Sequence, residues 1–127
     1  PLQWLLIDAR RMRMRVFDGL WVRLVDVEAA LCAREYADGA PLVLSITDPF
    51  CPWNEGSYRL KDGVATRTTD APDLQLSVDT LASTYLGAFR FTQLAAAGRV
   101  TELRPGALRQ ADALFAAAPA PWAPEIF

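Results

Sequence analysis

The sequence predicts an α+β domain in which a mostly antiparallel sheet carries helices packed on one face. Three observations favour this class. Several short segments alternate apolar and polar residues, turn residues separate them, and apolar stripes at helical spacing lie toward both ends of the strand block. The 127 residues, 52% of them hydrophobic, suit one globular domain with a substantial core. We therefore expect a single domain over residues 1–127.

Strands are expected where the alternation has a period of two. Asp18-Gly19 precedes the first such segment, and Lys61-Asp62-Gly63 predicts the turn of an antiparallel hairpin. Residues 48–56 contain two prolines, Asn and Gly, so we expect a loop there. The expected strands, in order, are residues 20–25, 42–47, 57–60, 64–69, 74–78 and 100–103.

Helices are expected where suitable capping residues precede an apolar stripe. Asp26 is the predicted N-cap of a helix over residues 27–36, and Asp79 or Thr80 that of a second helix. Residues 91–95 form a third, short apolar face, and Pro105-Gly106 opens the last helix. Glycines are expected to end or interrupt these helices, at Gly39, Gly87 and Gly98.

Charge and composition exclude several classes of function. The net charge of −2 gives no electrostatic case for nucleic acid or an anionic membrane as the main partner. Residues 11–15 alternate Arg and Met, which we interpret as a solvated strand edge or a domain-boundary contact in preference to a basic nucleic-acid strip. No apolar run approaches the ~18 residues of a membrane helix.

The chain also lacks histidine, the residue type that many catalytic sites depend on. This absence removes Ser-His and Cys-His machinery and the commonest zinc ligand. Cys32 and Cys51 are too few for a disulfide framework or a zinc site, so we expect no metal and two reduced thiols in a cytoplasmic protein. Cys32 is expected to be an inert, buried thiol in its helix. This chain alone has little with which to be an enzyme.

Two internal groups of residues have both a functional and a structural interpretation. Asp48, Asn54 and Glu55 suit a carboxylate site, but turn chemistry and N–H capping explain them more simply. Two sets of apolar residues also have two interpretations. One set suggests a ligand site, although buried or interface packing is favoured, and consists of Trp21, Trp53 and Trp122. The other set suggests an apolar tunnel, although ordinary core packing is favoured, and consists of Leu81, Tyr85, Leu86, Phe89 and Phe91.

The last residues are apolar, aromatic and stiffened by proline, from Pro121 to Phe127. A C-terminus is usually polar and frayed, so this one is expected to be placed against something. A placed terminus delivers a free α-carboxylate, an acceptor and potential base that no internal residue supplies. From the residues alone, a packed tail and a functional carboxylate at Phe127 both remain open.

Blocks along nearly the whole chain resemble, in order, the C-terminal domain of the enhanced-intracellular-survival (Eis) N-acetyltransferases. No single block is specific for this family, but the occurrence of all of them in the same order is. The matching blocks are residues 18–27 before an Ala-rich helix, Asp48-Pro49-Phe50 with Asn54, Gly56, Arg59 and Leu60, then Asp73-Leu74, Leu81, Tyr85-Leu86-Gly87, residues 94–100, and the ending from Pro121 to Phe127.

The resemblance implies a third domain with a sterol-carrier-protein-like fold, after two acetyltransferase-like (GNAT) domains. Residues 1–17 would then be a boundary segment from the preceding acetyltransferase domain, and residues 119–127 a placed C-terminal tail. It also implies acetyl transfer from acetyl-CoA to amines such as aminoglycosides or lysine side chains. The acetyl-CoA site and a tyrosine general acid would lie in the absent first domain, with no cofactor bound by this chain, and the full-length protein would be a hexamer.

The resemblance assigns the general base to the carboxylate of the last residue, which by position is Phe127. An attacking amine must be neutral, and a base near it removes the proton. Glu125 is a second candidate, for holding cationic substrates, although the family often has its acidic residue directly beside the terminal aromatic, where this chain has Ile126. We expect the chain alone to be inactive. A lipid- or sterol-binding module and a purely structural assembly domain are the alternatives, and secretion of the parent protein stays open.

Overall fold

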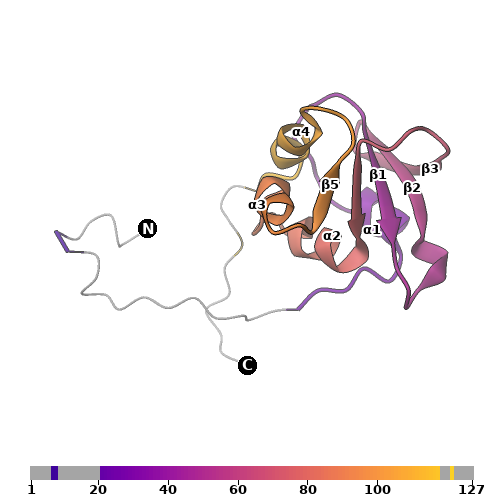
Figure 1. The fold of residues 1–127 in the computed structure, drawn as a ribbon, viewed down its shortest axis with the longest axis horizontal. Helices are drawn as coiled ribbons and strands as arrows, with labels where there is room; N and C mark the ends of the chain where they lie inside the picture. Colours follow the sequence, from indigo (N-terminus) through magenta and orange to yellow (C-terminus); the bar gives the residue numbers. More distant parts are fainter. Residues whose placement is uncertain (1–6, 9–20, 118–120, 122–127) are drawn as a thin grey trace.

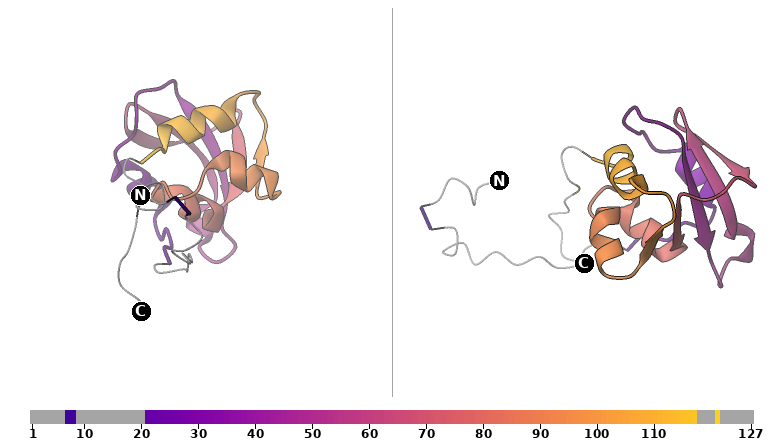
Figure 2. Two further views of the ribbon diagram at one scale, coloured as in Figure 1. Left: turned by 90° about the vertical axis from the view of Figure 1, so that its left-hand side faces the viewer. Right: turned by 45° about the horizontal axis from the view of Figure 1, so that its top comes forward.

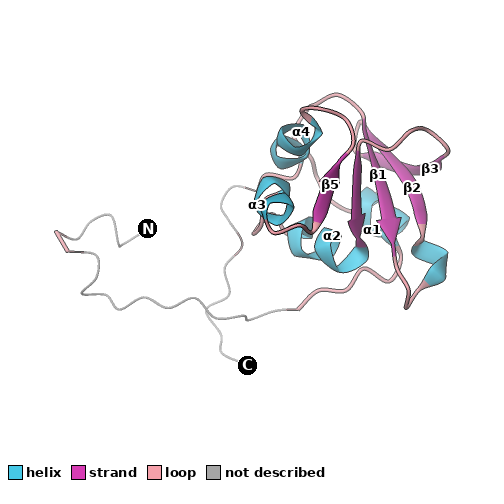
Figure 3. Ribbon diagram, in the orientation of Figure 1, coloured by secondary structure: helices cyan, strands magenta, loops and turns pink. Residues whose placement is uncertain are grey.

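Four α-helices and five strands are distributed along the part of the chain that the structure describes (Figure 1, Figure 3). The structure is a computed structural model, and it describes residues 7–8, 21–117 and 121. The helices are α1 (Val27–Cys32), α2 (Val78–Tyr85), α3 (Phe91–Ala96) and α4 (Ala107–Leu114), with one short 3-10 helix, η3 (Pro52–Asn54). The strands are β1 (Leu42–Thr47), β2 (Gly56–Lys61), β3 (Val64–Thr68), β4 (Leu74–Ser77) and β5 (Val100–Glu102).

The strands form one sheet in the order β3-β2-β1-β4-β5. All neighbours are antiparallel except β1 and β4, which are parallel, so the sheet is mostly antiparallel, as predicted, but mixed. The parallel pair arises because residues 69–73 carry the chain from β3 past β2 and β1 to β4 (Figure 1). Asp70 in this connection forms an ion pair with Arg59 of β2, on the exposed face of the sheet. The alternation in the sequence identifies strands but not the path between them.

One face of the sheet is apolar because the strands are in register. Leu42 lies opposite Leu60, and Leu44 lies between Tyr58 of β2 and Leu74 of β4. All four helices contribute buried side chains to the same core cluster, so they cover this face, as the sequence predicted (Figure 2). These helical residues are Val27 and Leu31 of α1, Leu81 of α2, Phe91 and Leu94 of α3, and Ala107, Ala111 and Leu114 of α4. The opposite face carries Ser45, Arg59, Thr66 and Gln75, together with the apolar and buried Val43.

The prediction of a strand over residues 20–25 is wrong for residues 21–25, the part that the structure describes. Residues 21–26 form no regular structure, although Leu24 is buried. The carbonyls of Leu24 and Val25 accept hydrogen bonds from the Asn54 side chain, so these groups do not form a sheet ladder. Helix α1 begins after Asp26, whose carboxylate accepts from Ala29 N at 2.9 Å, and this confirms the predicted N-cap. It ends at Cys32, four residues earlier than expected, and the Tyr36 hydroxyl bonds back to the Leu31 carbonyl.

The later elements follow the prediction with small shifts. The hairpin is confirmed, with Asp62 and Gly63 both at positive φ, as a two-residue turn requires. Helix α2 begins at Val78, and its N-cap is Ser77. The predicted caps, Asp79 and Thr80, are wrong, because both residues lie inside the helix. Gly87, at φ 81°, lies just after its end. The predicted pattern at residues 11–15 lies outside the described residues, and so do the boundary segment 1–17, apart from Ile7 and Asp8, and the tail 119–127, apart from Pro121.

Candidate functional site

The two predicted site residues, Phe127 and Glu125, lie outside the described residues, as does Trp122. What the structure does describe is how the rest of the domain holds the two segments that lead into and out of its core. One group of polar contacts fixes residues 23–27 to the loop after β1. A second group fixes the residues that follow α4. We call them the loop network and the α4 anchor.

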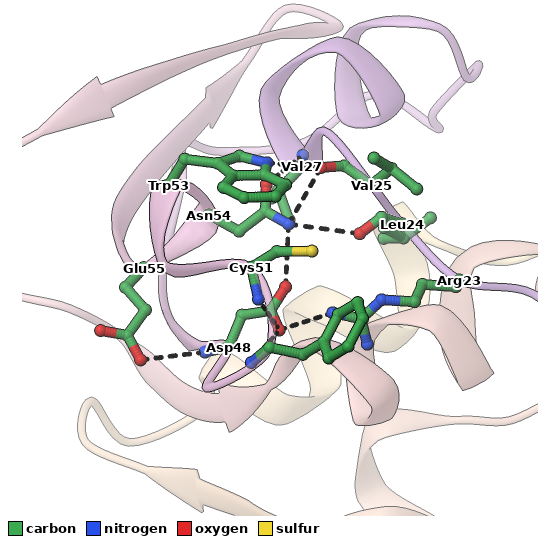
Figure 4. Close-up of polar contacts among 10 residues, drawn as sticks. Arg23, Leu24, Val25, Val27, Asp48, Cys51, Trp53, Asn54 and Glu55 are labelled. Carbon is green, nitrogen blue, oxygen red and sulfur yellow. Dashed lines mark hydrogen bonds and ion pairs between the residues drawn. The ribbon is translucent and has the colours of Figure 1, made fainter.

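The loop network is built around the buried carboxylate of Asp48, which directly follows β1 and is 1% exposed (Figure 4). Its Oδ1 accepts hydrogen bonds from Arg23 Nη2 at 2.6 Å, from Cys51 N at 3.0 Å and from Phe50 N at 3.3 Å. Its Oδ2 accepts from Asn54 Nδ2 at 2.9 Å. Both carboxylate oxygens are therefore already engaged by groups of the domain itself.

Asn54 connects this carboxylate to the segment before α1 (Figure 4). The side chain is 1% exposed, and its Oδ1 accepts the hydrogen bond of Val27 N at 3.0 Å. Its Nδ2 donates to the carbonyls of Leu24 and Val25 as well as to Asp48. One amide side chain thus provides hydrogen-bond partners for the first N–H of α1 and for two backbone carbonyls that are not paired with a strand.

The electrostatics of Asp48 are those of a structural carboxylate. Burial raises its pKa, but the hydrogen bonds from Asn54, Cys51 N and Arg23 outweigh burial and hold the pKa below its usual value. A general base near neutral pH needs the opposite, a raised pKa and a free lone pair. Glu55, the third member of the suggested carboxylate site, is exposed and accepts from Asp48 N at 3.3 Å. The capping and turn interpretation of this group is therefore confirmed.

The aromatic residues suggested as a ligand site or tunnel separate into two sets. Leu81 and Phe91 are fully buried in the core, which confirms the expected core packing for these two residues. Leu86 and Phe89 are exposed. Trp21 is 84% and Trp53 61% exposed, so neither is a core residue.

The expectation of a buried thiol at Cys32 is wrong. Cys32 is exposed near the end of α1, and its Sγ contacts both the N–H and the carbonyl of Ala65 at 3.3 and 3.4 Å. Helix α1 ends directly after Cys32, so this residue lies at the rim of the helix–strand contact with β3 and not inside it.

The α4 anchor holds the chain where it leaves the last helix. Arg34 donates from Nη2 to the carbonyl of Phe115 at 3.1 Å, and Ala37 N donates to the Leu114 carbonyl at 3.3 Å. The Arg34 guanidinium also lies over two rings, 4.5 Å from the centroid of Phe115 and 4.8 Å from that of Tyr36. Burial lowers the pKa of Arg34, and its Nη1 has no hydrogen-bond partner among the described residues.

Gly87 completes the α4 anchor from the other side. A Cβ atom at this position would lie 2.5 Å from the Cβ of Ala117 and 3.2 Å from the Phe115 carbonyl oxygen. Such an approach is possible only for glycine, which also tolerates the φ of 81° found here. The backbone at residues 115–117 is therefore held between Arg34 and the turn after α2.

Two surface hollows of about 530 Å³ each flank the anchor. One is lined by residues 34–40, 60–63 and Leu114, the other by residues 87–91, Gln93, residues 112–113 and residues 115–117. Neither is an apolar tunnel of the kind a lipid chain needs. Within the described part of the chain, no helix is long and apolar enough to cross a bilayer, and no three His, Cys, Asp or Glu side chains are grouped as a metal site needs.

Residues 27–124, which include most of both contact groups, match the family of sterol carrier protein domains. The chain belongs to that family. Its relatives specify the type further, because they are N-acetyltransferases, among them proteins named Eis. The chain is thus similar, along nearly all of its length, to one part of the Eis-type enzymes, as the sequence resemblance indicated.

An uncharacterized N-acetyltransferase of Streptomyces avermitilis is 50% identical over 97% of this chain and 31% of its own length. The N-acetyltransferase Eis of Mycobacterium tuberculosis is 41% identical over 91% of the chain and 29% of its own length. Among solved structures, Eis1 from Mycobacterium abscessus superposes with a TM-score of 0.79 at 45% identity, over 83% of this chain and 27% of that one. The chain therefore spans less than a third of the length of these relatives.

Sequence reasoning identified Asp48 and Asn54 but not their partners. The alternating pattern places Arg23 in a predicted strand, and its pairing with Asp48 across 25 residues has no local signal. Helical spacing places Arg34 on the same face as Ala30 and Leu31, and a charged residue on an apolar face is a signal that something apolar or anionic lies against it. Its partner, Phe115, is 81 residues away.

Proposed function

We propose that this chain is the sterol-carrier-like domain of an acetyl-CoA-dependent N-acetyltransferase of the Eis type. In this proposal the domain is a scaffold for the preceding acetyltransferase domains of the same chain, which would bind acetyl-CoA. The carboxylate of Phe127 is the general base that accepts the proton of the attacking amine. Aminoglycosides and lysine side chains are the proposed acceptors, Glu125 would help to hold them, and the full-length protein would assemble as a hexamer.

The observation that carries the proposal is the similarity to N-acetyltransferases along nearly the whole chain. The α4 anchor supports it physically. A terminus that delivers a base needs a fixed starting point, because each unconstrained residue before it adds conformational freedom that must be lost on positioning. Residues 115–117 are held by Arg34 and Gly87. From there, residues 118–127 reach at most ~35 Å when fully extended, which is the span of a small domain.

The proposed base needs an altered pKa. A free α-carboxylate has a reference pKa of roughly 3.3–3.7, which is low for a base at neutral pH. Removal from water in a closed site destabilises its charged form and raises the pKa toward the working range. The same negative charge attracts polycationic amines before the reaction, so one group serves both steps.

The experiment extends the full-length enzyme by one glycine after Phe127. This moves the carboxylate by roughly 3.5 Å and places an amide where the base was. We expect kcat with an aminoglycoside to fall by about 10²–10⁴, the usual contribution of general-base catalysis, with little change in the melting temperature.

The matched control is Phe127→Leu, which alters the side chain but keeps the terminal carboxylate in place, and it should retain most of the activity. Unchanged turnover in the extended enzyme would disprove the catalytic role and favour the alternative of a purely structural assembly domain.

A further inference from the structure

The second of the two surface hollows, between the loop after α2 and the end of α4, has a largely apolar lining. Its volume is about 530 Å³, within the range of about 300–1,000 Å³ that is usual for sites enclosing a small organic group. Phe91 and Phe115 in its lining are buried and meet edge to face, with ring centroids 4.9 Å apart. Most of the other lining residues are glycine or alanine, so they contribute little side-chain volume of their own.

Two polar side chains of the lining, Gln93 and Asp112, already have partners within the domain. Asp112 accepts hydrogen bonds from Thr92 N at 3.3 Å and from the Thr92 hydroxyl at 2.6 Å, and Gln93 Oε1 accepts from Arg90 N at 3.1 Å. A polar ligand would have to compete with these bonds, which fix the start of α3. An aromatic group does not compete with them, so the hollow favours an aromatic occupant.

Phe89 is the exposed aromatic residue of the lining. It is 54% exposed, although it lines the same hollow as the two buried phenylalanine rings. The turn before it is fixed, because Gly87 N donates to the Thr84 carbonyl at 2.8 Å and Gly87 packs closely against Ala117. A ring presented by a fixed turn loses little conformational freedom when a second apolar group covers it. Phe89 therefore offers an aromatic partner a rigid contact.

The chain itself supplies an aromatic residue at short range. Ala116 and Ala117 belong to the lining, and Trp122 follows Ala117 by five positions. Five residues span at most roughly 17 Å, so the indole is confined to the neighbourhood of the hollow. Such a short tether gives a local concentration in the millimolar range, so a contact of low intrinsic affinity is sufficient. Pro119 and Pro121 reduce the number of conformations that the segment loses on binding.

We propose that the indole of Trp122 packs into this hollow and covers Phe89. The proposal goes beyond the proposed function, because it needs neither acetyl transfer nor a preceding domain. It also has a consequence for that function. If the terminal carboxylate is the base, the part of the tail that must still be ordered becomes residues 123–127 instead of residues 118–127, which lowers the entropic cost of placing the carboxylate.

The test measures the exposure of Trp122 by ¹⁹F NMR of the chain labelled with 5-fluorotryptophan. The chain has four tryptophans, and the variants Trp122→Phe and Trp21→Phe identify the two resonances that are compared. Trp21, which is 84% exposed, is the internal standard for a hydrated indole. Replacing H₂O by D₂O shifts the resonance of an exposed fluorine and leaves that of a buried fluorine nearly unchanged.

We expect the solvent-induced shift of Trp122 to be less than half that of Trp21. Phe89→Ala and, separately, Ala113→Lys, which places a charge in the lining, should each raise it to the Trp21 value; both positions are exposed, so the fold should persist. Phe50→Ala, which removes an exposed ring outside the hollow, is the matched control and should leave the shift unchanged.

A solvent-induced shift of Trp122 equal to that of Trp21 in the unmodified chain would overturn the proposal. So would a small shift that either lining variant leaves unchanged. Protection of Trp122 that increases with protein concentration would identify a second copy as the partner and would also overturn it. None of these readouts depends on turnover, so the proposal can fail while the catalytic role of Phe127 stands, and the reverse.

Discussion

Replacing Asn54 by alanine tests the loop network most directly. The Asn54 side chain is 1% exposed and bonds to groups on two segments, with Val27 N, the Leu24 and Val25 carbonyls and Asp48 as its partners. Alanine removes all these contacts but leaves every partner in place. The loss is therefore expected to exceed that of the hydrogen bonds alone, since buried groups without partners are costly.

The magnitude follows from which partners are left unsatisfied. Val27 N is buried and would lose its acceptor, at about 1–3 kcal/mol, and Asp48 would lose a charge-assisted bond worth about 1.5–3 kcal/mol. The carbonyl of Val25 keeps the Trp53 indole as a donor, so we assign it no cost, and the hydrogen bond to the Leu24 carbonyl is long, at 3.3 Å, so we leave it out of the sum. The expected decrease in the free energy of unfolding is therefore about 4 kcal/mol.

Urea unfolding followed by tryptophan fluorescence measures this decrease. With an m-value of about 2 kcal/mol/M, which is ordinary for a chain of this size, the midpoint should fall by roughly 2 M at an unchanged m-value. The control is Gln75→Ala, which removes an amide from the exposed face of β4 and should alter the free energy by less than about 0.5 kcal/mol. If Asn54→Ala lowered the midpoint no more than Gln75→Ala does, the loop network would not hold the segment before α1 as argued.

Two further predictions test the acid behaviour of the loop network and the α4 anchor. Because the folded-state pKa of Asp48 lies below its unfolded value of 3.8, its contribution to stability is present above about pH 4 and is lost as the pH falls through the folded pKa. Asp48→Asn should thus lower the urea midpoint at pH 7. The difference in midpoint between this variant and the original chain should be smaller at pH 3, and an equal difference at the two pH values would contradict a lowered pKa of Asp48. Gly87→Ala should lower the melting temperature by roughly 5–10 °C, since it combines a strained positive φ with contact against Ala117. Gly98→Ala, which has a φ of 74° but no atom within 4 Å of the new Cβ, is its control and should cost markedly less.

Local patterns predicted most of the secondary structure because the forces that select it are local. The alternation over residues 42–47 specifies a strand that buries one face, and Asp62-Gly63 specifies the hairpin turn that aligns β2 with β3. The Asp26 cap was equally predictable, since its carboxylate bonds to an N–H three residues away. The error at residues 20–25 has the converse cause. Alternation indicated a strand, but the Asn54 side chain satisfies the backbone groups that a neighbouring strand would have bound.

The sequence by itself determined the α+β class, the positions of β1 to β5 and the resemblance to Eis-type domains, because these depend on residue order and on contacts over a few residues. The tertiary structure alone decided the parallel pairing of β1 with β4, the bonding of Arg23 to Asp48, and the stacking of Arg34 on Phe115. Each of these joins residues 25 or more positions apart in the sequence. Such contacts form when the core brings distant segments together, and the energy that selects them belongs to the packed whole and not to any segment within it.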